Sequence, residues 1–116
     1  MAETTVTATN DRRHSEQVLD VREDFEVASG VIPGALHIPM GQLRSRLSEL
    51  EKDTPVIVVC RSGNRSAQVA DALNAAGFTA DTMAGGMTAW VAAGLPVGRA
   101  EGAPAQGSAR QARRTP

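Results

Sequence analysis

The feature that most constrains this chain is a run of four β-branched apolar residues at 56–59, followed by Cys60 and a polar loop. Such a run is typical of a strand that is buried on both faces of a parallel sheet. Beyond the loop, apolar residues recur at helical spacing, at Val69, Ala70, Leu73 and Ala76. The sequence therefore predicts a strand, a tight loop and a helix, in that order.

This order places Cys60 where a protein can hold an anion. In an open α/β sheet, ligands bind beyond the carboxyl ends of the strands, and the amino terminus of a helix favours negative charge. The loop also carries Arg61 and Arg65. A free cysteine at the end of a core strand is often just a small buried residue. The arginines and the helix start favour a thiolate instead, because both features lower the pKa of a thiol.

The segment from Cys60 to Arg65 resembles the active-site loop of the rhodanese family of sulfurtransferases, in which a nucleophilic cysteine opens a six-residue loop that ends in arginine. Two further blocks are similar to family motifs. The first consists of Leu19-Asp20-Val21-Arg22 with Glu26 and Gly30, followed by Ile32-Pro33-Gly34-Ala35 and Ile38-Pro39. The second is Gly85-Gly86-Met87-Thr88-Ala89-Trp90. The chain departs from the family at Val31, where histidine is usual, and at Val27, where an aromatic residue is usual.

The resemblance implies an α/β, three-layer rhodanese-like fold, with a mainly parallel five-stranded sheet and helices on both faces. A chain of 116 residues suits one such domain, which we expect over residues 6–98. Residues 1–5 are expected to be a loose N-terminus. Residues 99–116 are expected to be a disordered basic tail, because they lack the large apolar side chains that would offset the entropy of ordering them.

Local patterns predict the individual elements. Strands are expected over residues 6–8, 18–21, 35–38, 56–59 and 79–83, and helices over 23–28, 42–50, from the loop to Gly77, and around Trp90. Trp90 is interpreted as a core anchor. The turn at Gly85 and Gly86 should face the Cys60 loop, because the missing side chains allow close backbone approach.

Three further residues need an interpretation. We expect Arg22 to pair with Glu26 one turn later. Asp20 is expected either to have a structural role or to form a hydrogen bond near the loop and help to shape it. His37 has no second histidine or acidic cluster at ligand spacing, so it is interpreted as a packed strand residue. We therefore predict no metal site, and no cofactor is implied.

The resemblance implies that the protein is an enzyme, a thiosulfate sulfurtransferase. Cys60 would take the outer sulfur of thiosulfate or a similar donor as a persulfide, which a cyanide or thiol acceptor then receives. Arg65 would fix the shape of the loop. Arg61 would meet the anionic donor, and the N–H groups of the loop would hold the charged sulfur. The residues expected to bind substrate are Arg61, Ser62, Gly63, Asn64 and Ser66, with Asp20 and Arg22 in support.

Two other functions stay open. A phosphatase or arsenate reductase would have five residues between cysteine and arginine, whereas four separate Cys60 from Arg65, and the loop has no acidic residue to protonate a leaving group. The chain could instead be a persulfide carrier or an anion-binding module that serves a protein partner.

The cellular setting follows from simpler features. One cysteine excludes an internal disulfide and favours a reducing, cytoplasmic location. No apolar stretch approaches the length of a membrane span. A short basic tail is usually solvated. The expected partners are a small-molecule sulfur donor and a thiol or cyanide acceptor, with a protein sulfur acceptor as a further candidate, and neither nucleic acid nor a membrane.

Overall fold

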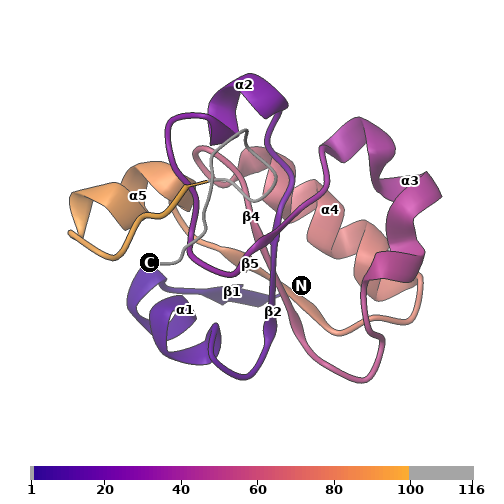
Figure 1. Ribbon diagram of the computed structural model, residues 1–116. Helices are drawn as coiled ribbons and strands as arrows, with labels where there is room; N and C mark the ends of the chain where they lie inside the picture. The colour runs from indigo at the N-terminus through magenta and orange to yellow at the C-terminus, as the bar shows by residue number, and fades with distance from the viewer. Residues whose placement is uncertain (1, 100–116) are drawn as a thin grey trace.

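A computed structural model describes residues 2–99 and arranges them as a central parallel sheet with helices on both faces (Figure 1). All strand pairs of this sheet are parallel, and the strand order is β1-β5-β4-β2-β3. The strands are β1 (Ala2–Thr4), β2 (Gln17–Asp20), β3 (Leu36–His37), β4 (Val56–Val59) and β5 (Ala80–Met83). The expected three-layer α/β fold is confirmed.

The helices divide between the two faces and the carboxyl edge of the sheet (Figure 1). Helices α1 (Val6–Arg12) and α5 (Gly86–Ala92) cover one face, while α3 (Leu43–Arg46) and α4 (Asn64–Ala75) cover the other. Helix α2 (Asp24–Val27) follows β2. Short 3₁₀ helices, η1 (Met40–Gln42) and η2 (Leu47–Glu49), flank α3, so the single helix expected over residues 42–50 is divided into short pieces. None of the helices within residues 2–99 has the length and apolarity that a membrane span needs.

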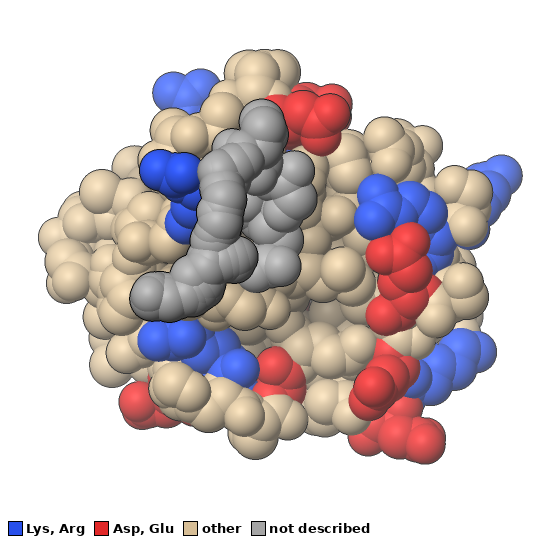
Figure 2. All heavy atoms as spheres, viewed as in Figure 1, with Lys and Arg blue, Asp and Glu red and all other residues tan. Residues whose placement is uncertain are grey.

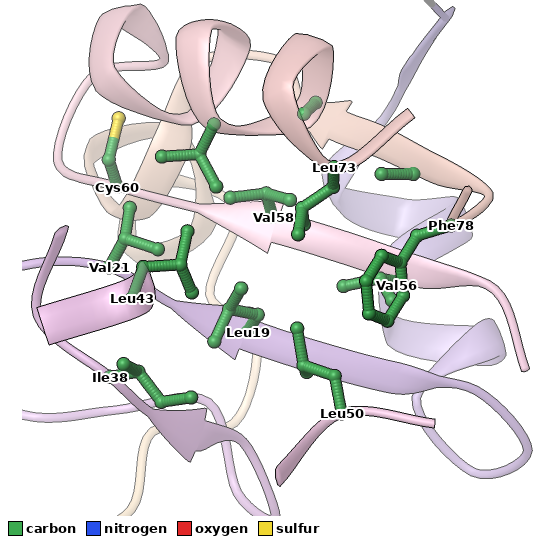
Figure 3. Packing of buried hydrophobic residues seen from close by; sticks show 13 residues of the cluster. Leu19, Val21, Ile38, Leu43, Leu50, Val56, Val58, Cys60, Leu73 and Phe78 are labelled. Atoms are coloured by element: carbon green, nitrogen blue, oxygen red, sulfur yellow. The ribbon is translucent and has the colours of Figure 1, made fainter. Parts of the chain in front are cut away.

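Strand β4 lies at the centre of the core because both of its faces are covered. Its four side chains are fully buried. Val56 and Val58 pack with Leu19, Leu73 and other aliphatic residues beneath α3 and α4 (Figure 3). Ile57 and Val59 join the cluster around Trp90 on the opposite face. The continuous β-branched run therefore has the buried position that the sequence predicted.

The amino-terminal expectations are wrong for the residues that the structure describes. Residues 2–4 are not loose, because Ala2–Thr4 forms the edge strand β1 beside β5. Residues 6–8 are helical rather than extended, because the Thr5 hydroxyl caps α1 by accepting a hydrogen bond from the Ala8 N–H at 3.0 Å. Residue 1 and residues 100–116, including almost all of the expected tail, lie outside the described residues.

Candidate active site

Cys60 lies at the carboxyl end of β4, and its sulfur points toward the first turn of α4 (Figure 3). The side chain is buried. Gly63 takes the left-handed conformation, with φ 109°, as the N-cap residue of α4. This turn directs the Gly63 N–H to the Cys60 Sγ at 3.0 Å and brings the Ser66 hydroxyl to 3.4 Å from the same sulfur.

These contacts control the ionisation of the thiol. Burial acts to raise the pKa of Cys60, but the Ser66 hydroxyl and the backbone N–H groups of Ser66, Gly63 and Ser62 outweigh it and lower the pKa below its ordinary value. The sequence predicts that arginine charge contributes to this lowering of the pKa. In the structure, hydrogen bonds from uncharged groups dominate it.

The Gly85-Gly86 turn lies against the loop, as the sequence predicted. A Cβ atom on Gly86 would lie 2.5 Å from the carbonyl oxygens of both Cys60 and Arg61, and the φ of Gly86 is +58°. The close approach lets α5 hold the loop, because the Met87 and Thr88 N–H groups donate to those carbonyls at 2.9 and 3.0 Å. Only glycine fits at this position.

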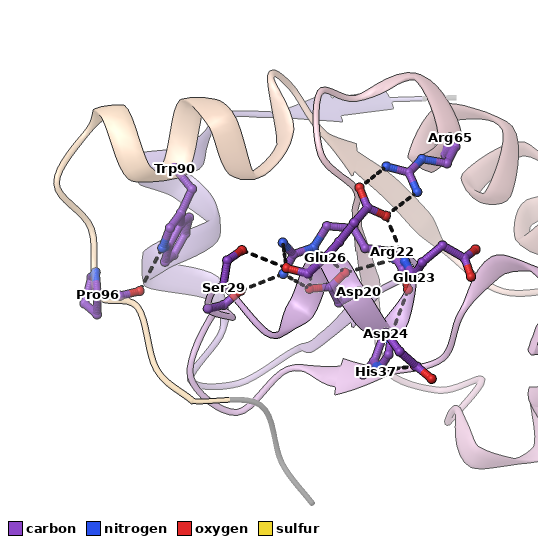
Figure 4. A network of polar contacts seen from close by, with 11 residues as sticks. Asp20, Arg22, Glu23, Asp24, Glu26, Ser29, His37, Arg65, Trp90 and Pro96 are labelled. Carbon is purple, nitrogen blue, oxygen red and sulfur yellow. Dashed lines mark hydrogen bonds and ion pairs between the residues drawn. The ribbon is translucent and has the colours of Figure 1, made fainter. Parts of the chain in front are cut away.

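Arg65 closes the loop and is held from outside it. Its guanidinium donates two hydrogen bonds to the Glu26 carboxylate, at 2.7 and 2.9 Å (Figure 4). The bond from Arg65 is the main reason that the pKa of Glu26 falls from 4.5 to about 2. Glu26 also accepts the Glu23 N–H at 2.9 Å, which ties the loop to the start of α2. Sequence reasoning missed this pair, although Glu26 lies in one of the family-like blocks.

The expected pair between Arg22 and Glu26 is corrected by the structure. Arg22 instead binds the Asp20 carboxylate through its Nε and Nη2 atoms, with Nη2 at 2.7 Å, and both side chains are buried (Figure 4). The Arg22 guanidinium also donates hydrogen bonds to the main-chain carbonyls of Gly30, through Nη2, and of Glu26, through Nη1. The Asp20 carboxylate accepts from the side chain and N–H of Arg22, and within residues 2–99 it forms no hydrogen bond to the Cys60 loop.

The remaining assignments concern His37 and Trp90. His37 Nε2 lies 2.7 Å from the carbonyl oxygen of Arg22, as a hydrogen-bonded strand residue should. Trp90 is fully buried, and its indole N–H donates to the Pro96 carbonyl at 2.8 Å. Within the described part of the chain, no three His, Cys, Asp or Glu side chains are grouped as ligands for a metal ion.

A surface pocket of about 480 Å³ lies beside the loop, with Arg61 in its wall. The large apolar side chains that are exposed in residues 2–99 all line this pocket. They are Phe25, Val91 and Val97, which are 79%, 58% and 46% exposed. No carboxylate within the described residues forms an ion pair with Arg61. The pocket therefore combines a cation with an apolar rim.

The described charges elsewhere are mixed. On the face shown in Figure 2, basic and acidic side chains lie side by side over α3. Arg46 and Glu49 form one such pair, with a contact of 2.7 Å. This part of the surface does not have the clustered basic character that is typical of nucleic-acid-binding proteins.

Comparison with known proteins agrees with the fold. The rhodanese-like domain family matches residues 5–93. The chain is 47% identical over 73 residues to the "Putative sulfurtransferase YtwF" of Bacillus subtilis, covering 63% of this chain and 71% of the relative. It is 41% identical over 86 residues to a sulfurtransferase of Allochromatium vinosum, covering 73% of this chain and 80% of the relative.

Solved structures give the same result. A rhodanese-related protein from Thermoplasma volcanium superposes with a TM-score of 0.80 and 33% identity, covering 84% of this chain and 97% of that one. The chain therefore belongs to the rhodanese-like family.

Proposed function

We propose that this protein is a thiosulfate sulfurtransferase whose nucleophile is Cys60. The observation that carries the proposal is the Cys60 sulfur itself, which lies at the end of a parallel strand among hydrogen-bond donors that lower its pKa. A thiolate at this position is a nucleophile that needs no general base. The family's sulfur-transfer chemistry requires such a group.

In the first step, the Cys60 thiolate attacks the outer sulfur of thiosulfate. A new S–S bond forms as the S–S bond of thiosulfate breaks, and sulfite leaves with the electron pair of that bond. In the second step, cyanide or a thiolate attacks the outer sulfur of the Cys60 persulfide. The electron pair returns to Cys60, and thiocyanate or a new persulfide leaves. Atoms and charge balance without an external oxidant or reductant.

The loop residues have separate roles in this scheme. The N–H groups of Ser62, Gly63 and Ser66 stabilise the thiolate. The first N–H groups of α4, which begins at Asn64, have no intrahelical carbonyl partner and so suit the outer sulfur of the persulfide. Arg61, in the wall of the pocket, meets the oxygens of thiosulfate. Arg65 keeps the loop in place through Glu26.

The first experiment incubates the purified protein with thiosulfate and measures its intact mass. It then adds cyanide and follows thiocyanate, with Cys60→Ser treated in parallel. We expect the wild type to gain the mass of one sulfur atom and to lose it to cyanide with turnover, whereas the variant does neither. If the wild type takes no sulfur from thiosulfate or from mercaptopyruvate, the proposed reaction is wrong.

A second candidate is a persulfide carrier that serves one protein partner. The exposed apolar rim of Phe25, Val91 and Val97 favours it, because thiosulfate and cyanide are too small and polar to use that surface. A carrier would form the persulfide readily but pass it slowly to cyanide. Either activity needs a free thiol, so we also propose a reducing, cytoplasmic setting.

A further inference from the structure

Thr82 is a polar residue in the middle of the buried sheet, and it has no role in the reaction steps proposed above. It lies on β5 opposite Val58 of β4, and its side chain is 1% exposed. Its hydroxyl oxygen lies 2.6 Å from the hydroxyl oxygen of Ser66, which is also fully buried. Ser66 is the residue whose hydroxyl contacts the Cys60 sulfur. Thr82 therefore lies directly behind the thiol, one hydroxyl away.

Counting protons fixes the direction of these hydrogen bonds. The Ser66 hydroxyl has one proton, and its three neighbours are the Thr82 hydroxyl, the Gly63 carbonyl at 3.1 Å and the Cys60 sulfur at 3.4 Å. A carbonyl only accepts, so the proton shared with Gly63 belongs to Ser66. The short contact must then be donated by Thr82. With the thiol protonated, Ser66 accepts from both Thr82 and Cys60 and donates to Gly63.

Ionisation of Cys60 changes one of these bonds. The thiolate cannot donate, so the Ser66 proton turns from the Gly63 carbonyl to the sulfur. The Gly63 carbonyl keeps a partner, because the Ala67 N–H also reaches it, at 3.3 Å. Thr82 still donates to Ser66, which fixes the Ser66 oxygen and polarises its O–H bond toward the sulfur. The buried hydroxyl pair is thus able to serve both protonation states without leaving a polar group unpaired.

We propose that Thr82 is a positioning residue for the nucleophile, acting through the Ser66 hydroxyl to stabilise the Cys60 thiolate. Its importance for catalysis rests on the sulfurtransferase function proposed above. Its effect on the thiol does not, because ionisation can be measured without any sulfur donor. A failure of this inference can therefore be distinguished from a failure of the proposed function.

Charged groups around the loop stay unchanged in the test. Those that face it or adjoin it are Arg61, Arg65, Glu26, the Asp20–Arg22 pair and Asp81, which is next to Thr82 on β5 but binds Arg12. The variants below remove only uncharged hydroxyls, so a change in the ionisation of Cys60 reports on the hydroxyl pair.

The experiment measures the rate of Cys60 alkylation by iodoacetamide across a pH series, which gives the pKa of the thiol. Thr82→Val replaces the hydroxyl by a methyl group of similar size and should raise the Cys60 pKa by about half a unit. Ser66→Ala removes the direct donor and should raise it by about one unit or more. Thr82→Ser keeps a hydroxyl at this position and should give the same pH profile of Cys60 alkylation as the wild type.

The decisive comparison is the double variant. If Thr82 acts through Ser66, adding Thr82→Val to Ser66→Ala should cause no further change in the profile. Circular dichroism checks that each variant is folded, and Thr82→Ala replaces Thr82→Val if the latter does not fold. A wild-type profile in the folded Thr82→Val protein would overturn the inference. So would a Thr82→Val effect that persists in full without the Ser66 hydroxyl.

Discussion

The bond between Arg65 and Glu26 should be a measurable part of the protein's stability, and Glu26→Gln is the perturbation that tests it. The fall of the Glu26 pKa from 4.5 to about 2 corresponds to at most about 3.4 kcal/mol of stabilisation. Solvent screens the pair in part, because the side chains of Arg65 and Glu26 are 32% and 13% exposed. We therefore expect Glu26→Gln to lower the free energy of unfolding by about 1.5–2 kcal/mol at neutral pH.

The pH dependence gives this prediction its sign. The pKa of Glu26 is lower in the folded protein, so its stabilisation is complete above pH 4.5 and disappears as the pH falls toward about 2. Urea denaturation followed by circular dichroism should show a gap between wild type and variant near pH 7 that narrows strongly by about pH 3.

Glu49→Gln is the matched control for this prediction. Glu49 forms a similar two-point contact with Arg46, at 2.7 and 3.0 Å, but only three residues away in sequence and on the exposed surface. We expect no resolvable change there. If Glu26→Gln and Glu49→Gln behave alike, or if the gap for Glu26→Gln does not depend on pH, then the long-range pair does not stabilise the fold as argued.

Three other predictions concern the loop and its pocket. Gly86→Ala should cost about 2–4 kcal/mol in denaturant unfolding, because its methyl group would lie 2.5 Å from two carbonyl oxygens at a positive φ. Gly41→Ala, with nothing within 4 Å, is the control that should change little, and equal losses would refute the close approach. Phe25→Ala should leave stability within about 0.5 kcal/mol because the ring is 79% exposed. It should also raise the KM for an aromatic thiosulfonate several-fold, but not the KM for thiosulfate; unchanged values for both would show that the rim binds no substrate. In stopped-flow measurements, persulfide formation should slow as the pH falls through the lowered pKa of Cys60, and Arg61→Ala should weaken thiosulfate binding without moving this profile. A midpoint at or above about 8.5, the value for a free thiol, would contradict the ionisation argument.

The strand, loop and helix around Cys60 could be predicted because their signals are local. A β-branched run, small polar residues and a helical apolar stripe each determine the structure of their own segment, and the structure places β4 at Val56–Val59 as expected. The amino terminus has no such signal. Threonine favours strands but also caps helices, and Ala2–Thr4 is a strand only because β5 lies beside it.

The partners of Arg22 and Arg65 show where sequence spacing misleads. Glu26 lies four residues after Arg22, which favours a pair on a regular helix. Helix α2 has only four residues and starts after Arg22, so the buried Asp20 carboxylate is the better partner. Glu26 is then free for Arg65, which lies 39 residues further along the chain. No local pattern could reveal that contact, because it exists only once α2 and α4 lie at the same edge of the sheet.

The sequence suggested that the two arginines of the loop lower the pKa of Cys60. In the structure, other groups lower it. Arg65 is largely neutralised by Glu26, and no carboxylate in residues 2–99 pairs with Arg61. The charge on Cys60 is instead held by N–H groups and the Ser66 hydroxyl, which bind an anionic sulfur without adding net charge. In the proposed reaction, this neutral set of donors would hold the thiolate and then the persulfide with similar strength, because both carry one negative charge. In the proposed reaction, Arg61 then binds the oxygens of the donor, and binding of the donor and ionisation of Cys60 depend on different groups.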